Sequence, residues 1–199
     1  ILFCSACLII KTMTEDTKTA YLIRPDLHIG KAELESIVTG QLMGTVSMAE
    51  AEGICSSIYR AMEPELCFCF SGDDTILAAA TLGRGTDRLI EKTHESGSMV
   101  RVYAYDSICL YLLKKMYRFI SAEALKSGLY ISKYRFPEPQ TDIFFRILND
   151  LRTGISEDSA AFPISVTDSG MLTPLKTTLF MAYLTAEESL QCHDICDIC

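Results

Sequence analysis

Helix-forming residues dominate the first folded stretch of the chain, residues 31–62. Gly40 and Gly44 interrupt this stretch, and glycines of this kind break a helical pattern. The sequence therefore predicts two helices, the second of which runs over about residues 48–62. Pro64 follows and ends the second helix, because proline cannot continue a helical hydrogen-bond ladder.

Two apolar runs follow, and a turn separates them. Residues 66–70 read as a strand, and Ser71-Gly-Asp-Asp74 is a turn signal. Residues 75–82 form a continuous apolar run, which is typical of a strand buried on both faces. Because the turn between the runs is tight, they are expected to pair as an antiparallel hairpin.

The same patterns predict the rest of the chain. The further elements are helices at residues 86–94, 98–126 and 140–151, and strands at residues 129–134, 164–167 and 176–184. Helices that alternate with antiparallel hairpins indicate an α+β protein, with helices packed on a mainly antiparallel sheet. No internal repeat or linker divides the chain, so residues 21–186 are expected to form a single domain. Residues 1–20 are expected to be a disordered or artefactual extension, and residues 187–199 a cysteine-rich tail.

Composition narrows the class of protein. The 199 residues are 49% apolar and 22% charged, a composition that excludes a chain that is tail-like or disordered as a whole. Lysine and arginine number 18 against 26 acids, a net charge of −8. An acidic chain without a basic run is not expected to bind nucleic acid or an anionic membrane. The apolar residues 1–10 fall short of the roughly 20 residues that a spanning helix needs.

The nine cysteines indicate a reducing compartment, because their number is odd and their spacing irregular. Cys67 and Cys69 alternate along a predicted strand, so both thiols should point to one face. We expect them to be buried and reduced, which fits a cytoplasmic protein.

An aspartate interrupts the apolar face of the predicted helix at residues 98–126. That face comprises Val102, Asp106, Cys109, Leu113, Met116 and Ile120, spaced by alternating fours and threes. Because burial of an unpaired carboxylate costs several kcal/mol, Asp106 needs a partner or a cavity. Two interpretations remain open: a hydrogen bond to the backbone of a neighbouring loop, or a place in a ligand site.

Two further motifs carry candidate chemistry. Gly83-Arg-Gly85 follows a strand and opens a helix that Thr86 or Asp87 is expected to cap. Because Arg88 occupies the place of the third glycine in a dinucleotide fingerprint, a tight turn is the better interpretation. At the C-terminus Cys192, Cys196 and Cys199 lie beside His193 and are candidate ligands for zinc or an iron–sulfur cluster, the alternative being an oxidation-prone tail.

Several segments, in the same order, resemble the activation domain of cobalamin-dependent methionine synthase, particularly the free-standing form from anaerobic bacteria. Residues 77–90 resemble its apolar strand, Thr-x-Gly turn and following helix, and residues 164–178 resemble its C-terminal signature. Asp106 matches the one aspartate in its long helix, and residues 140–148 resemble the helix after its Gly-Tyr-Pro loop. The matching positions are Asp106, Thr167, Asp168, Ser169, Met171 and Pro174, and Tyr134 and Pro137 correspond to the family loop, although its glycine is missing and Arg135 follows the tyrosine instead of preceding it. The resemblance implies cofactor binding for all of these residues, Arg135 included, except Pro174.

The resemblance also implies a role. Domains of this family bind S-adenosylmethionine beside a corrinoid-carrying domain, where an electron from flavodoxin or a similar donor and the methyl group restore methylcobalamin. This chain would then be an accessory part of a methyltransferase. Its cofactors would be S-adenosylmethionine and the cobalamin of its partner, and its partners a corrinoid-binding methionine synthase chain and a flavodoxin-like donor. The segments at Thr81-Leu-Gly, Asp106 and Thr167-Asp-Ser are expected to border one cleft.

Two other functions stay open. Leu110 stands where full-length methionine synthases have a ligand-contacting glutamate, so the chain is alternatively a non-catalytic partner that docks a corrinoid protein without binding S-adenosylmethionine. The third hypothesis is a metal-linked or redox-linked role for the cysteine-rich tail.

Overall fold

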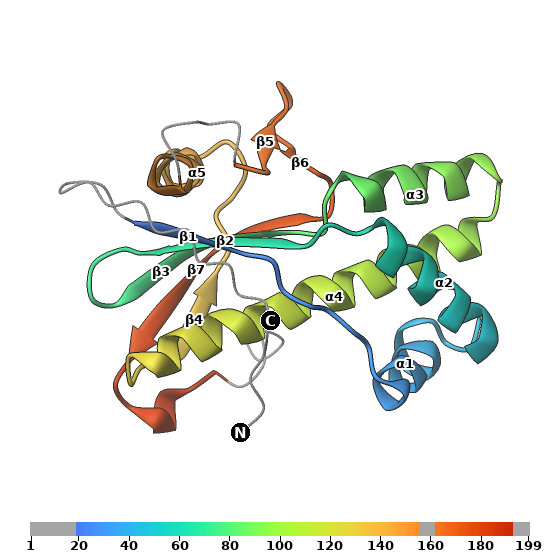
Figure 1. Ribbon diagram of the computed structural model, residues 1–199, viewed down its shortest axis with the longest axis horizontal. Helices are drawn as coiled ribbons and strands as arrows, with labels where there is room; N and C mark the ends of the chain where they lie inside the picture. The colour runs from blue at the N-terminus through green and yellow to red at the C-terminus, as the bar shows by residue number, and fades with distance from the viewer. Residues whose placement is uncertain (1–18, 156–161, 193–199) are drawn as a thin grey trace.

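An antiparallel sheet of five strands, in the order β1-β2-β3-β7-β4, forms the centre of the computed structural model, which describes residues 19–155 and 162–192 (Figure 1). Its strands are β1 (Ala20–Ile23), β2 (Glu65–Phe70), β3 (Thr75–Thr81), β4 (Tyr130–Arg135) and β7 (Thr177–Thr185). A separate two-stranded hairpin consists of β5 (Ser165–Val166) and β6 (Leu172–Thr173). The α+β class and the antiparallel pairing of the strands are therefore confirmed.

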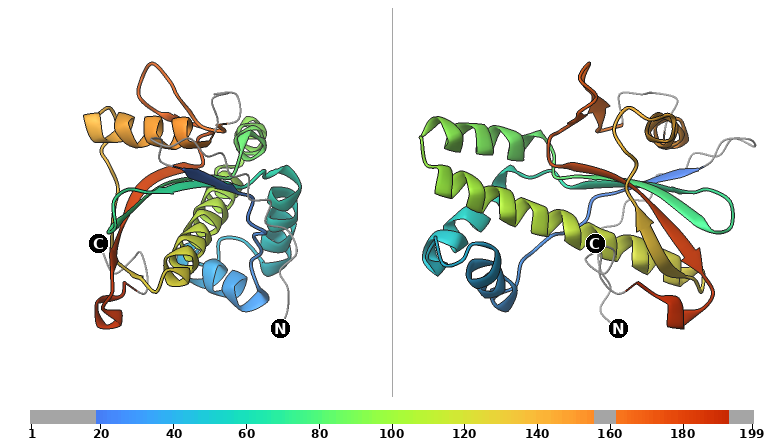
Figure 2. Two further views of the ribbon diagram at one scale, coloured as in Figure 1. Left: turned by 60° about the vertical axis from the view of Figure 1, so that its left-hand side comes forward. Right: turned by 180° about the vertical axis from the view of Figure 1, so that it is seen from behind.

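Helices cover both faces of this sheet. They are α1 (Lys31–Ser36), continued by a π-helical turn (Ile37–Gln41), α2 (Met48–Ala61), α3 (Arg84–Glu95), α4 (Met99–Lys126) and α5 (Asp142–Ile155), with a short 3-10 turn at Glu188–Leu190. Figure 2 shows α4 inside the curve of the sheet and α5 on the opposite face. The helices α1, α2 and α3 pack around α4 and extend the structure beyond one end of the sheet.

Alternation along the strands divides the core between these two helices. Leu66 and Phe68 of β2 face α4, whereas Cys67 and Cys69 face α5, and all four are buried. The predicted common face of the two thiols is confirmed, and burial raises the pKa of Cys67 far above its ordinary value.

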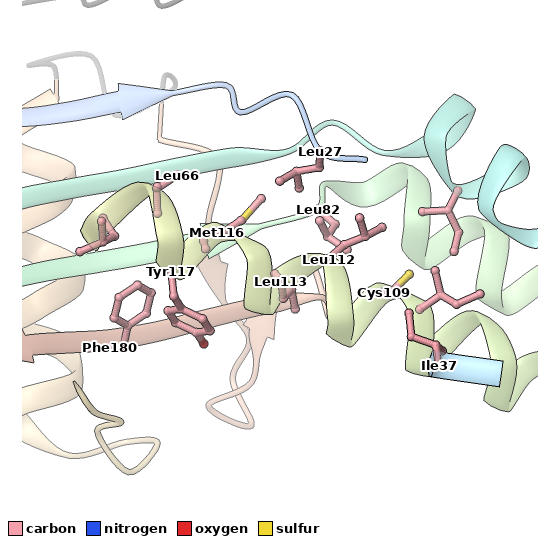
Figure 3. Close-up of a cluster of buried hydrophobic side chains, with 14 of the residues drawn as sticks. Leu27, Ile37, Leu66, Leu82, Cys109, Leu112, Leu113, Met116, Tyr117 and Phe180 are labelled. Atoms are coloured by element: carbon pink, nitrogen blue, oxygen red, sulfur yellow. The ribbon is translucent and has the colours of Figure 1, made fainter. Parts of the chain in front are cut away.

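The core on the α4 side is the larger of the two (Figure 3). Leu112 and Met116 are fully buried on the helix face that contacts the sheet. The ring of Tyr117 meets the ring of Phe180 edge-on, with 4.6 Å between their centroids. Because the phenol is buried, the pKa of Tyr117 is raised to about 12.

A bulge in β4 decides the direction of Tyr134. The pairing register of β4 with β7 shifts between Ile131 and Lys133. An extra residue on one strand reverses the alternation beyond it, so Ile131 and Tyr134 both face the core on the α4 side. Strict alternation would have placed these two side chains on opposite faces.

Most of the predicted elements agree closely with the observed ones, although α5 ends at Ile155 and not at residue 151, and further differences concern two strands and α3. The short strands β1 and β6 were not predicted, because neither has enough residues to show a periodic pattern. The start of α3 was predicted too late. Its N-cap residue is Gly83, and no side chain caps it: Thr86 Oγ1 donates to the Gly83 carbonyl, and Asp87 accepts from a distant backbone amide.

The first turn of α3 lies against the end of α2, and this close approach requires glycine. Gly83 has a φ of 82°, in the left-handed region. A Cβ at Gly85 would lie 1.8 Å from the carbonyl oxygen of Ala61. The two glycines thus form a tight strand-to-helix turn, in agreement with the sequence interpretation.

An ion pair fastens α1 to α4. Lys115 Nζ lies 2.8 Å from Glu33 Oε2 and also donates to the carbonyl of His28, and Tyr111 Oη lies 2.9 Å from Glu33 Oε1. The Lys115 hydrogen bonds, aided by the backbone amide of Gly30, lower the pKa of Glu33 from 4.5 to about 2. The charged form of Glu33 therefore stabilises the fold.

We predict that Gly85→Ala destabilises the protein by about 3 kcal/mol or more, because the methyl group overlaps backbone atoms that cannot move aside. Gly53→Ala is the matched control: Gly53 lies in α2, and no atom lies within 4 Å of the position that the new methyl group would occupy. It should be neutral or stabilise by up to about 1 kcal/mol. Urea denaturation measures both variants, and equal effects would contradict the prediction.

We predict that Glu33→Gln lowers the free energy of unfolding by about 1 kcal/mol at pH 7. The folded-state pKa lies below the unfolded value, so this contribution is present above about pH 4.5 and disappears as the pH falls toward 2. Denaturation at pH 7 and at pH 3 measures the difference from the wild type. Glu123→Gln removes an exposed pair with Lys126 and should change stability by less than about 0.5 kcal/mol at either pH.

Candidate functional site

A groove of about 500 Å³ lies where β4 ends and leaves one edge of β7 uncovered. The ladder between β4 and β7 ends at the pair Arg135 and Met181, so the first residues of β7 pair only with β3. The residues that line the groove come from the loop after β4, the start of α5, the β5–β6 hairpin and β7 with the segment just before it. They are Phe136, Pro137, Pro139, Phe144, Ser169, Gly170, Met171, Leu172, Leu175, Thr177, Thr178 and Leu179.

Hydrogen bonds hold the hairpin wall of the groove. Thr167 accepts at Oγ1 from the Met171 amide, and its Oγ1 lies 2.8 Å from Ser169 Oγ. Gln140, just before α5, donates from Nε2 to the Ser169 carbonyl at 2.7 Å. The side chain of Gln140 lies over Gly170, where an added Cβ would come within 2.3 Å of it. The hairpin is thereby tied to the loop that forms the opposite wall.

The lining of the groove is apolar and uncharged. Phe136 is 46% exposed, Met171 55% and Leu175 56%, so three large apolar side chains surround its mouth. The threonine hydroxyls of Thr177 and Thr178 are the polar side-chain groups that β7 contributes. This arrangement suits a ligand with a flat or aliphatic body and few charges at the contact surface.

Three of the sequence-predicted residues meet in this groove: Pro137, Ser169 and Met171. Thr167 is bonded to Ser169 and supports the wall. Asp168 is exposed beside them on the hairpin turn and is not among the lining residues.

Tyr134 and Arg135 do not line the groove. The bulge in β4 turns Tyr134 toward α4, where it is only 4% exposed and its Oη lies 3.3 Å from Ser121 Oγ. Burial raises the pKa of Tyr134 above its ordinary value. Arg135 is exposed at the end of β4. The resemblance grouped both residues with a ligand site, but their surroundings are a packed core and open solvent.

Asp106 forms an ion pair with Lys176, the residue just before β7. The Lys176 side chain is 16% exposed and that of Asp106 is 40% exposed. The carboxylate is thus less buried than the apolar stripe suggested. Its partner is a lysine side chain rather than loop backbone, and it lines neither this groove nor the second hollow described below.

Residues 175–177, at the start of β7, are hydrogen-bonded to residues at the end of β3 and in the first turn of α3. The Leu175 amide donates to Asp87 Oδ2 at 2.8 Å, and Thr177 Oγ1 donates to Thr81 Oγ1 at 2.9 Å. Thr81 itself borders a different hollow, together with Gly83. The expected single cleft around all three motifs is not found in either hollow: Thr81 and Gly83 border one, Ser169 lines the other, and Asp106 lines neither.

Sequence analysis missed Phe136, Leu175 and Lys176. Phe136 carries a detectable signal, since an aromatic residue within a proline-rich loop has no strand or helix face to bury it. Lys176 carries none, because its role depends on an aspartate 70 positions away.

Of the candidate metal ligands, only Cys192 belongs to the described residues, where its amide donates to the Ile131 carbonyl at 2.7 Å. Cys196 and Cys199 lie outside them. Across residues 19–155 and 162–192, no group of three or more histidine, cysteine, aspartate or glutamate side chains could hold a metal ion. Nor is any helix in these ranges long and apolar enough to span a bilayer.

We predict that Lys176→Met destabilises the protein by about 1–3 kcal/mol, because it removes the partner of Asp106 while its own position stays largely buried. Lys126→Met removes an exposed lysine from a pair within one helix and should cost less than about 0.5 kcal/mol. Thermal or urea unfolding compares the two variants. Equal losses would show that the Asp106–Lys176 pair contributes no more than a surface pair.

Comparison with known proteins adds no relative: no protein-family model matches the chain, and no curated protein matches it significantly.

Proposed function

We propose that this protein is an activation component of a cobalamin-dependent methionine synthase and binds S-adenosylmethionine in the groove at the edge of β7. The observation that carries the proposal is the convergence of Pro137, Ser169 and Met171 on one groove. These residues come from two segments about thirty positions apart, and the sequence resemblance had selected them independently of any structure.

The size and chemistry of the groove support this ligand. Its volume of about 500 Å³ lies within the range of roughly 300–1,000 Å³ that is usual for small-molecule sites. Phe136 offers an exposed ring for stacking on an adenine or for contact with a sulfonium cation. Among the described residues, the lining contains no lysine or arginine that would repel that cation, and the charged amino-acid end of the ligand would have to lie toward solvent.

The uncovered edge of β7 adds hydrogen-bonding groups. Residues 177–180 pair with β3 on one side and lack a β4 partner on the other. Backbone groups at such an edge are available to a ligand as well as to another strand. An adenine, which carries donors and acceptors along its edges, suits such a border.

In this role the chain contributes binding and orientation. The groove opens to solvent between exposed apolar side chains, so a bound donor could present its methyl group to a docked partner. When bound to the partner, the corrinoid supplies the cobalt that takes up one electron and then the methyl group.

One observation favours the second candidate, a partner that docks a corrinoid protein without binding S-adenosylmethionine. Asp106, which the resemblance assigned to the ligand, is already paired with Lys176. A carboxylate held by a lysine is less available to a ligand hydroxyl or amine.

We predict that S-adenosylmethionine binds the purified protein and that Phe136→Ala weakens this binding by about fivefold, the effect expected for loss of one stacking contact. Phe145→Ala is the matched control, since Phe145 is 48% exposed and does not line the groove. It should leave the affinity unchanged within about twofold. Isothermal titration calorimetry measures all three proteins.

A parallel titration with a corrinoid-loaded methionine synthase chain separates the two candidates. Binding of both S-adenosylmethionine and the corrinoid protein supports activation. Binding of the corrinoid protein alone supports the docking function, and binding of neither rejects both. Equal loss of affinity in Phe136→Ala and Phe145→Ala would reject the groove as the site.

A further inference from the structure

A second hollow has a volume of about 840 Å³ and is lined by residues of α2 and α3, among others. These two helices lie at one end of the sheet (Figure 1). Most of the residues that line the hollow belong to the loop after β1, to the end of α2 and its link to β2, and to the start of α3. It shares no lining residue with the groove at β7. Nothing in the proposed function uses it.

Two arginines on its wall have no ion-pair or hydrogen-bond partner among the described residues. Arg84 and Arg88 lie one helical turn apart on α3, so both point to the same side of the helix. Neither forms an ion pair or a hydrogen bond with any residue in the ranges 19–155 and 162–192. This is unexpected in a chain whose acids outnumber its lysines and arginines by 26 to 18.

The other charged groups on the wall are largely compensated. Arg24 Nη2 lies 2.9 Å from Glu65 Oε1, and Asp26 Oδ1 lies 2.8 Å from Nε2 of His28. Glu63 is the one acid on the wall without an ion pair among the described residues. Among the described residues, Arg84 and Arg88 are thus the cationic groups on the wall that no acid engages, and their side of the hollow can receive an anion.

The backbone that carries Arg84 is held in place. A Cβ at Gly83 would lie 2.8 Å from the Cβ of Glu63, and one at Gly85 would lie 1.8 Å from the Ala61 carbonyl oxygen. Arg84 thus sits between two glycines whose close approach to the neighbouring chain fixes this wall. A preformed wall lowers the entropic cost of ligand binding.

The rest of the lining is suited to an organic body. The ring of Tyr59 and the side chain of Met62 contribute apolar surface, and Pro25, Pro64 and Pro174 add rigid apolar walls. Tyr59 is oriented by the Ile29 amide, which donates to its Oη at 2.9 Å. An anion with an apolar or aromatic part therefore fits better than a bare inorganic ion.

We propose that this hollow binds a small organic phosphate monoester, of which a nucleoside monophosphate is the simplest example. The phosphate accepts hydrogen bonds from Arg84 and Arg88, whose planar guanidinium groups match its geometry. The organic body lies against Tyr59 and the prolines. Glu63 accepts from a hydroxyl or amino group of the ligand.

The test is titration of the full-length protein with AMP, adenosine and inorganic phosphate by isothermal titration calorimetry. AMP should bind saturably, while adenosine and inorganic phosphate should each bind at least about tenfold more weakly. The double variant Arg84→Gln/Arg88→Gln should lose at least about tenfold in AMP affinity. Lys92→Gln, on the same helix outside the hollow, should change it by less than about twofold.

The unfolding midpoints of the wild type and the double variant are compared, to distinguish a loss of AMP binding from a loss of folding. Because both arginines are exposed, their replacement should leave stability unchanged. Equal affinity for AMP and adenosine would overturn the proposal, as would undiminished AMP binding in the double variant or no AMP binding at millimolar concentration. S-adenosylmethionine affinity of the double variant should match that of the wild type. Its loss, or competition between the two ligands, would show that the hollow is not a separate site.

Discussion

The pairing of β7 with both β3 and β4 is the interaction on which the rest of the structure depends. It joins the hairpin of β2 and β3 to the strand that follows α4, and β7 is the last strand of the described chain. The residues around its start add contacts to Asp87, Asp106 and Thr81, each at least 70 positions away. Contacts of such long range repay their entropic cost only when the whole sheet forms, so the groove and the two helix layers form together with it.

The same short segment separates the two hollows. Pro174 borders the arginine-lined hollow, Leu175 borders the uncharged groove, and Lys176 turns to Asp106 between them. These three residues form a bend just before β7, so neighbouring side chains reach different surfaces. The result is two hollows of different character on one small domain, one with an apolar lining and one with arginines on its wall.

Local sequence patterns predicted much of the fold. The long apolar stripe gave α4 to within one residue, and the turn after β2 gave the central hairpin. The common face of Cys67 and Cys69 followed from alternation alone. Of the residues that the sequence singled out for a site, Pro137, Ser169 and Met171 lie together in the groove, whereas Tyr134 lies in the core because of a bulge that no residue in β4 signals.

The sequence by itself determined where the main helices and the longer strands lie, the common face of Cys67 and Cys69, and the tight turn at Gly83 and Gly85, because propensity, periodicity and turn chemistry act over a few residues. Only the tertiary structure decided that Asp106 pairs with Lys176, that Tyr134 turns into the core, and that Arg84 and Arg88 face a hollow without acidic partners among the described residues. These outcomes depend on register, on a bulge and on contacts between distant segments, which are settled by the packing of the whole domain.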